Sequence, residues 1–295
     1  MADPLLSRFG VDPDARLGGG GEADVYALDA GRVLRLYKRP SLGLATRLRA
    51  FYEWLSGQDL PFATPTVLEV GESDGRTWTI DLRLQGTGML AAMPSLTAAE
   101  KAVTIDSYVR ATVALTALAP PPTSGFGDLL AEHPVVSSSW AEFLMARVEP
   151  AAARAADDLA AEGIDASAQV ERLHDQLVTV PPVAVPSLVH GDWFPGNVMI
   201  GNDLTVSALI DFSSLTFAGD PMMDVAGAVI FADSAVWTQP DHVALARTSA
   251  EALGFDDLDR HLALYRRWYG LFFSQYKADD AELFSRCVEW LRPGT

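Results

Sequence analysis

Residues 188–200 read LVHGDWFPGNVMI, and residues 209–212 read LIDF. In these segments Asp192, Asn197 and Asp211 each lie beside a short apolar run of the length typical of a buried strand. The run Trp-Phe-Pro-Gly after Asp192 favours a turn, and an acid in a loop between apolar strands is a common catalytic position. The pattern therefore predicts three polar side chains that are held at the ends of buried strands.

Two carboxylates and one carboxamide are the polar groups that phosphoryl transfer from ATP requires. One carboxylate orients the acceptor hydroxyl and takes up its proton, and we expect Asp192 in this role. Mg²⁺ prefers oxygen ligands, and one or two protein groups usually hold it together with phosphates and water. Asn197 and Asp211 are the expected magnesium ligands.

The order of these residues resembles the catalytic core of the aminoglycoside phosphotransferase family, in which small-molecule kinases share the protein-kinase fold. The resemblance rests on His-x-Asp at 190–192, Asn197 five residues after the Asp, and Ile-Asp-Phe at 210–212. It implies an α+β, two-lobed protein-kinase-like fold. We expect a small β-rich nucleotide-binding N-lobe at 1–85 and a larger helical C-lobe at 86–295, which carries the catalytic loop and the substrate site.

The same segment contains other polar residues for which we expect structural roles. His190 lies next to apolar residues and is expected to be a buried histidine that braces the loop. A zinc site at His190 and Asp192 is disfavoured because no second His or Cys pair lies at zinc-ligand spacing. The resemblance implies that Asp220 and Asp224 tie the catalytic loop to the following helix.

A glycine-rich run, Gly18, Gly19, Gly20 and Gly21, precedes the predicted strand 25–28. Such a run also occurs in flexible linkers. A strand follows it in place of a helix, and no Gly-Lys-Ser/Thr follows, which disfavours a dinucleotide fold and a P-loop. In the kinase fold a glycine-rich loop between two strands covers the ATP phosphates, and we expect that function here.

The next strand, 33–37, carries Arg35 on the face opposite to its leucines. The resemblance implies that a basic residue of this strand contacts the ATP phosphates. Arg35 is the first candidate and Lys38 the alternative. In the predicted helix 45–55 the only acid is Glu53, later than the family pattern puts it. Whether Glu53 pairs with Arg35 or is a solvated surface residue stays open.

The remaining chain divides into strands and then helices. A strand pair is expected at 66–70 and 78–84, followed by a connection at 85–88 whose backbone would contact the adenine. Helices are expected at 98–118, at 137–161 with a break at Pro150, at 166–178 and within 240–291. The aromatic residues of this last region are expected in the core.

The composition limits the classes of partner. The formal charge is 22 − 39 = −17 and the pI is about 4.5, which argues against nucleic acid and anionic membranes. Acids cluster at Asp157, Asp158, Glu162 and Asp165 and again at Asp256, Asp257 and Asp259. They are compatible with a cationic substrate and equally with solvated helix surfaces.

The sequence also bears on the location of the protein. No signal peptide is evident, and the longest apolar run, 225–232, is too short to span a bilayer. The single Cys287 allows no internal disulfide. We expect a soluble cytoplasmic protein, either a monomer or a homodimer.

The leading hypothesis is an ATP- and Mg²⁺-dependent phosphotransferase. Its acceptor would be a hydroxyl of a small molecule, such as an aminoglycoside-like antibiotic (a resistance function), an amino sugar or another metabolite. The alternative is a catalytically silent, nucleotide-binding pseudokinase. A protein kinase is disfavoured by the short segment between Asp211 and Asp220, and a hydrolase by the lack of a Gly-x-Ser-x-Gly motif.

Overall fold

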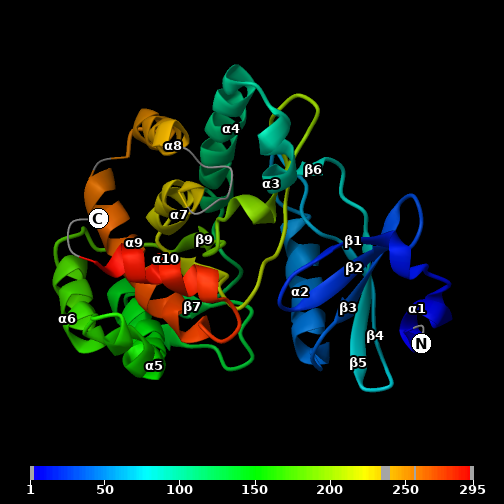
Figure 1. The fold of residues 1–295 in the computed structure, drawn as a ribbon, viewed down its shortest axis with the longest axis horizontal. Helices are drawn as coiled ribbons and strands as arrows, with labels where there is room; N and C mark the ends of the chain where they lie inside the picture. The colour runs from blue at the N-terminus through cyan, green and yellow to red at the C-terminus, as the bar shows by residue number, and fades with distance from the viewer. Residues whose placement is uncertain (1–2, 234–239, 256, 293–295) are drawn as a thin grey trace.

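The computed structural model describes residues 3–233, 240–255 and 257–292. Figure 1 shows an N-terminal part built around a β-sheet and a larger C-terminal part built mainly of helices. The predicted fold class is thereby confirmed. The division between residues 85 and 86 stays a prediction.

The N-terminal sheet is antiparallel throughout, with strand order β1-β2-β3-β5-β4. Its strands are β1 (Arg16–Gly19), β2 (Ala23–Ala27), β3 (Arg32–Tyr37), β4 (Val67–Ser73) and β5 (Arg76–Leu82). Tight turns join β2 to β3 and β4 to β5. The predicted hairpins are therefore present, and the glycine-rich run covers the end of β1 and the start of the turn to β2.

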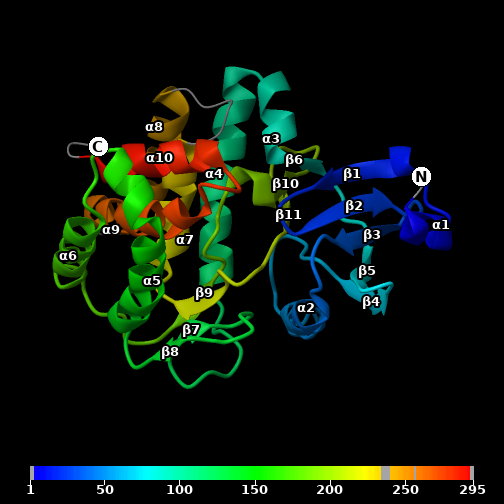
Figure 2. The same ribbon diagram turned by 60° about the horizontal axis from the view of Figure 1, so that its bottom comes forward.

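The two faces of this sheet differ in chemistry because side chains alternate along each strand. One face is apolar, with Leu34 and Ile80 packed against α1 (Pro4–Phe9). The opposite face carries Arg35 and packs against α2 (Leu42–Leu55), where Ala45 contacts Tyr37. Figure 2 shows α2 on one side of the sheet and α1 at its end. Arg35 therefore faces α2 and the C-terminal part.

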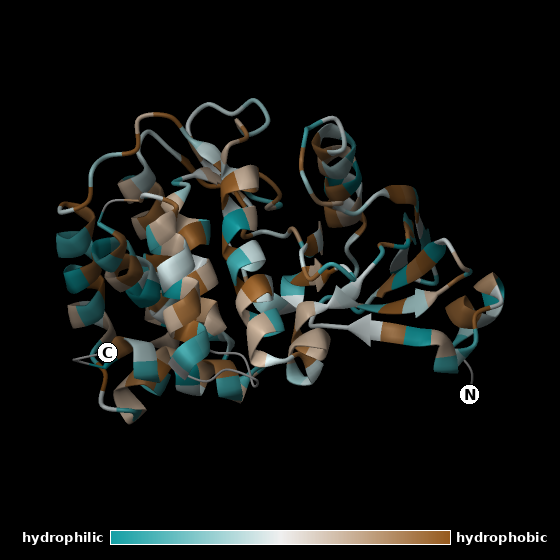
Figure 3. Ribbon diagram, turned by 90° about the horizontal axis from the view of Figure 1, so that it is seen from above, coloured by the Kyte–Doolittle hydropathy of each residue, from teal (hydrophilic) through white to brown (hydrophobic). Residues whose placement is uncertain are grey.

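Helices make up most of the C-terminal part. Their bounds are α3 (Met89–Ala92), α4 (Ala98–Thr116), α5 (Trp140–Ala161), α6 (Ala166–Leu177), α7 (Met222–Ala232), α8 (Pro240–Ala252), α9 (Leu258–Phe273) and α10 (Ala281–Leu291). Hydrophilic and hydrophobic residues alternate along the outer helices in Figure 3, as expected of helices with one buried face. The long helices predicted after residue 98 are therefore present.

The predicted break at Pro150 is wrong. Helix α5 runs through this residue without interruption. Proline cannot donate to the carbonyl of Ala146, but Pro150 is solvent-exposed, so water can satisfy that carbonyl. The buried residues on both sides, including Val148 and Ala151, hold the helix against the core. Tertiary packing therefore overrides the local preference.

Short strands support the loops between these helices. One sheet has the order β8-β7-β12-β9, with β7 (Phe126–Asp128), β8 (Val136–Ser137), β9 (Ser187–Val189) and β12 (Phe217–Gly219). Another has the order β11-β10-β6, with β6 (Thr87–Gly88), β10 (Val198–Ile200) and β11 (Val206–Leu209). The loop that carries Asp192 and Asn197 thus lies between β9 and β10, and Asp211 follows β11.

Two connections join the parts through the β10–β11 hairpin. Strand β6, which follows the N-terminal sheet, pairs with β10. Ala63, in the segment between α2 and β4, donates to the Ser207 carbonyl at 2.9 Å and accepts from the Leu209 amide at 3.0 Å. The side chain of Ser207 also donates to the Gln85 carbonyl at 2.9 Å.

One hydrophobic core extends from α2 into the C-terminal helices. Phe51 and Leu55 of α2 belong to the same buried cluster as Phe212 and the inner helices α7 and α9. The predicted aromatic core is present for Tyr265, Trp268, Tyr269, Phe272 and Phe273 of α9, which are buried. The prediction is wrong for Tyr276, which follows α9 and is 40% exposed. Helix α2 is therefore held against the segment around Phe212, after β11, by burial of apolar surface.

Candidate active site

The loop between β9 and β10 is anchored by Asp224 of α7. The buried Asp224 carboxylate accepts the backbone amides of His190 at 2.7 Å and Gly191 at 2.9 Å. Gly191 has φ +78°, and a Cβ there would lie 1.9 Å from the Leu215 carbonyl oxygen, so only glycine fits. The chain is thereby held in one conformation just before Asp192.

His190 has the bracing position expected of it. Its ring is fully buried, and Nε2 lies 2.9 Å from the Ile210 carbonyl. Burial lowers the pKa of His190 to about 4, so the ring is neutral near pH 7. The ring also lies 4.6 Å from that of Phe212. His190 therefore ties the catalytic loop to the Ile-Asp-Phe segment.

Asp192 and Asn197 lie in direct contact. Asn197 Nδ2 donates to Asp192 Oδ2 at 3.1 Å and to the Asp192 carbonyl at 3.0 Å. Because its nitrogen is occupied by these two bonds, Asn197 Oδ1 is the atom left to bind a cation. The bond also restricts the rotation of the Asp192 carboxylate.

Asp211 follows β11 and completes the group of three. Its backbone has φ +66°, a conformation that is costly for a residue other than glycine and that occurs preferentially at functional sites. Its side chain is 48% exposed, so it is open to a ligand. Arg35 Nη2 lies 3.7 Å from Asp211 Oδ1. The N-terminal sheet and the segment that follows β11 thus meet at this ion pair.

The two carboxylates also affect each other. Burial raises the pKa of Asp192 to about 7, the negative charge of Asp211 adds to the increase, and the bond from Asn197 opposes it. Two carboxylates near each other attract a cation. Mg²⁺ fits this arrangement, because Asp211 and Asn197 Oδ1 are oxygen donors that no described residue occupies with a hydrogen bond.

The aromatic ring of Phe212 packs beneath this site. It lies 5.2 Å from the Phe51 ring and 5.9 Å from the Tyr52 ring, both on α2. Phe212 therefore connects α2 to His190 and to the backbone of Asp211.

The glycine-rich loop closes on itself. The Gly20 amide donates to the Ala23 carbonyl at 3.1 Å, while Gly18, Gly20 and Gly21 have open space where a Cβ would lie. Lys38 Nζ donates to the Gly20 carbonyl at 2.6 Å. Lys38, the alternative to Arg35, therefore contacts the loop backbone, and Arg35 is the basic residue that lies beside Asp211.

Glu53 does not lie near Arg35. Its side chain is exposed on α2, and the neighbouring residue on the buried face is Tyr52. The buried acid near Arg35 is Asp81 of β5, whose charge Arg35 experiences together with that of Asp211. Alternation in the strand 78–84 was the available sequence signal for Asp81, since it places this acid on the same face as Thr79.

A family model described as the phosphotransferase enzyme family matches residues 15–266. The chain belongs to this family. The match spans the sheet, the catalytic loop and the helices up to α9, and so includes every residue of the site described above.

Solved structures of phosphotransferases have the same fold. The GDP complex of aminoglycoside 2'-phosphotransferase-IIIa has a TM-score of 0.64 at 15% identity, covering 97% of this chain and 94% of that one. APH(3'')-Id from Streptomyces rimosus, in complex with ADP and streptomycin, has a TM-score of 0.60 at 19% identity, with coverage of 91% and 96%. Macrolide 2'-phosphotransferase type I has a TM-score of 0.59 at 19% identity, with coverage of 99% and 95%. No curated protein sequence matches the chain.

The acidic clusters of this phosphotransferase have local partners. Asp158 pairs with Lys277 at 2.8 Å, Asp165 caps α6 by accepting the Ala168 amide, and Asp259 pairs with Arg247 at 2.5 Å. Asp257 pairs with Arg260, and Asp256 lies outside the described residues. These contacts account for most of the clustered acids without a substrate.

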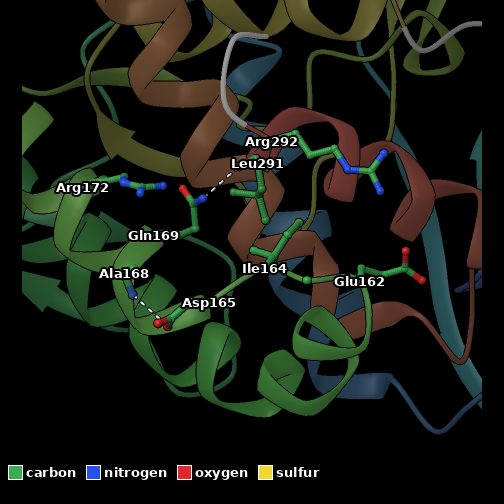
Figure 4. A pocket seen from close by; sticks show the side chains of 9 residues that line it. Glu162, Ile164, Asp165, Ala168, Gln169, Arg172, Leu291 and Arg292 are labelled. Carbon is green, nitrogen blue, oxygen red and sulfur yellow. Dashed lines mark hydrogen bonds between the residues drawn. The ribbon is translucent and has the colours of Figure 1, made fainter.

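A cavity of about 270 Å³ lies beside α6, at the edge of the C-terminal part farthest from the sheet. Glu162, Asp165 and Arg172 line it together with the end of α10 (Figure 4). The buried Gln169 in its wall donates to the Leu291 carbonyl and accepts from Arg267. This cavity is therefore separate from the site around Asp192.

Within the described residues, no helix is long and apolar enough to cross a membrane. The same residues contain no group of three or more His, Cys, Asp or Glu side chains suited to hold a metal ion.

Proposed function

We propose that this phosphotransferase moves the γ-phosphoryl group of ATP to a hydroxyl of a small molecule with the aid of Mg²⁺. The observation that carries the proposal is the convergence of Asp192, Asn197, Asp211 and Arg35. Asn197 contacts Asp192 at 3.1 Å, and Arg35 contacts Asp211 at 3.7 Å. Acid, amide, second acid and cation are the groups that phosphoryl transfer requires.

In this mechanism Asp192 accepts a hydrogen bond from the acceptor hydroxyl and takes its proton as the phosphoryl group is transferred. Asn197 keeps the carboxylate in one orientation. Because the transition state is largely dissociative, orientation contributes more than basicity. A pKa of Asp192 near 7 also suits a general base at neutral pH.

Asn197 Oδ1 and Asp211 would hold Mg²⁺, which when bound neutralises charge on the β- and γ-phosphates. Arg35 would contact the phosphates from the sheet, and the amides of Gly18, Gly19, Gly20 and Gly21 would cover them.

ATP and GTP are both reasonable phosphoryl donors to test. One solved relative binds GDP and another binds ADP, and we propose ATP as the donor of this enzyme. Among the same relatives the acceptors named are an aminoglycoside and a macrolide class. We propose that the acceptor of this enzyme is likewise a hydroxylated small molecule. If that molecule is an antibiotic, the enzyme would have an antibiotic-resistance function.

A catalytically silent pseudokinase is the second candidate, and the exposed position of Glu53 favours it. The geometry of Asp192 and Asn197 argues against it, since a silent protein has no need of an oriented carboxylate.

The test is a screen for ADP or GDP release with hydroxylated small molecules as acceptors and with the Asp192→Ala variant as the blank. We expect acceptor-dependent release by the wild type alone. Nucleotide binding without release for any acceptor would favour the pseudokinase, and no nucleotide binding would refute both.

The charge of the acceptor is tested with the best acceptor from this screen. A cationic acceptor bound by exposed carboxylates would show a KM that rises steeply with salt. An unchanged KM, with the KM for ATP measured in parallel, would refute a cationic acceptor and leave the transfer reaction unaffected.

A further inference from the structure

No carboxylate of helix α2 lies beside Arg35, although the family pattern places an acid on this helix to pair with the basic residue of the strand. Glu53 of α2 is exposed, and among the described residues Arg35 forms an ion pair only with Asp211. At 3.7 Å this contact is too long for a good hydrogen bond. If Asp211 holds Mg²⁺, as proposed above, its charge is no longer available to orient Arg35. A second counter-charge is then required.

Four buried polar atoms without a hydrogen-bond partner belong to Arg35 and to residues on the elements packed around it. They are Arg35 Nε itself, Thr79 Oγ1 and Asp81 Oδ1 on β5, and the Tyr52 hydroxyl on α2. A buried polar group without a partner is costly and calls for an explanation. Arg35 Nε, Asp81 Oδ1 and the Tyr52 hydroxyl are chemically complementary, because a guanidinium donates, a carboxylate accepts and a phenol does both.

Strand register brings Asp81 to the face of the sheet that carries Arg35. Arg35 is paired with Thr79, and Val33 is paired with Asp81. Paired residues of antiparallel strands share a face, and residues two apart on one strand do so as well. Helix α2 covers this face and contacts β5 (Figure 2).

Tyr52 reaches the same place from the helix. It is 2% exposed and packs on the ring of Phe212. The charges of Asp81 and Asp211 and the phenols of Tyr37 and Tyr52 are the groups that act on Arg35 from the elements packed around it. Glu22, which follows the glycine-rich run, also interacts with the charge of Arg35, but its side chain is exposed. Asp81 is thus the buried acid on the sheet that remains near Arg35 when Asp211 is occupied.

We propose that Asp81, assisted by Tyr52, is the positioning residue for Arg35, in place of a glutamate on the helix. The proposal rests on the proposed function, since it assigns Arg35 to the nucleotide phosphates. The side chains of Arg35 and Asp81 do not form a hydrogen bond or an ion pair in this structure. A guanidinium has five N–H donors, so if Nε turned to Asp81 when Asp211 is occupied, the terminal nitrogens would stay free for phosphate oxygens. Asp81 would act through Arg35 and would not touch the nucleotide.

The experiment compares binding of ATP and of adenosine by calorimetry at saturating Mg²⁺, the condition in which the proposed function has Asp211 occupied. Asp81→Asn keeps the shape of the side chain and removes its charge, and Tyr52→Phe removes only the hydroxyl. Glu53→Gln is the matched control, because it removes an exposed acid from the same helix. Each substitution is made in the wild type and in the Arg35→Ala background.

We expect Asp81→Asn to weaken ATP binding about tenfold and to leave adenosine binding unchanged. Tyr52→Phe should give a smaller loss of the same kind, and Glu53→Gln no loss. In the Arg35→Ala background Asp81→Asn should have no further effect on the ratio of ATP to adenosine affinity, because the residue through which Asp81 acts is gone.

A merely structural role for Asp81 gives a different pattern. Equal losses for ATP and adenosine, or a full additional loss of ATP affinity in the Arg35→Ala background, would overturn the proposal. If Asp81→Asn does not fold, Tyr52→Phe carries the same comparison. A wild type that binds ATP no better than adenosine would refute the proposed function as well, whereas tight ATP binding unaffected by Asp81→Asn or Tyr52→Phe would refute this inference alone.

Discussion

Replacing Asp224 by alanine should destabilise the fold because two specific hydrogen bonds are lost. The buried carboxylate accepts the amides of His190 and Gly191 at 2.7 and 2.9 Å. Each amide left unpaired in the interior costs about 1–3 kcal/mol, so Asp224→Ala should lower the free energy of unfolding by roughly 2–6 kcal/mol. That is a large part of the total of about 5–15 kcal/mol typical of a folded protein.

The assay is urea unfolding followed by tryptophan fluorescence, with Asp175→Ala as the control. Asp175 is an exposed acid in the last turn of α6, and its loss should change the stability by about 0.5 kcal/mol or less. Asp224→Asn keeps one acceptor oxygen and should lie between wild type and Asp224→Ala. If Asp224→Ala costs no more than Asp175→Ala, the two bonds do not hold the loop.

The dependence on pH gives a second readout with a definite sign. Burial raises the pKa of Asp224 to about 7 from a usual 3.8. The folded state therefore binds a proton that the unfolded state has lost, and the stability that this group contributes falls as pH rises from about 4 to 7. Asparagine does not titrate. The difference in free energy of unfolding between the wild type and Asp224→Asn should therefore become smaller as pH rises from about 4 to 7 and should stay constant above pH 7.

The remaining predictions concern the reaction. Asp192→Asn should lower kcat by about a hundredfold or more with nucleotide affinity nearly intact, since this residue serves the acceptor; near-normal turnover in the purified variant would remove it from the mechanism. Asp211→Ala should abolish the Mg²⁺-dependent part of ATP binding, because one of two proposed protein ligands is lost; titration with and without Mg²⁺ checks this, and an unchanged dependence would point to another site. The kcat/KM for the acceptor should rise with pH, with a midpoint near 7 and a plateau above it, because Asp192 must be ionised and burial raises its pKa to about 7; a profile that is flat between pH 5 and 8 would contradict a base at this position.

The sequence was sufficient to predict the fold class and the order of most elements. Residues 188–212 combine a local motif with apolar strand-like runs, so each predicted side chain of that segment could be placed without knowledge of distant contacts. Asp192, Asn197 and Asp211 indeed lie together, and Arg35 lies beside Asp211. Their chemical roles stay predictions.

What the sequence could not predict depends on contacts between distant residues. The helix through Pro150 persists because of its buried face, which is a tertiary effect. The placement of Asp81 on the same face of the sheet as Arg35 depends on the register of β3 against β5. The β7–β8 pair consists of strands of two or three residues, too short for any periodic signal.

The two connections through the β10–β11 hairpin have a mechanical consequence. The pairing of β6 with β10 and the bonds of Ala63 to Ser207 and Leu209 are two attachment points on one hairpin. These attachments come from the segment before β4 and from the segment after β5, so both ends of the β4–β5 hairpin are fixed to the same short element. Asp211 is only two residues beyond Leu209, and Arg35 of the sheet lies 3.7 Å from its carboxylate. The β10–β11 hairpin therefore sets the position of Asp211 relative to the strand that carries Arg35.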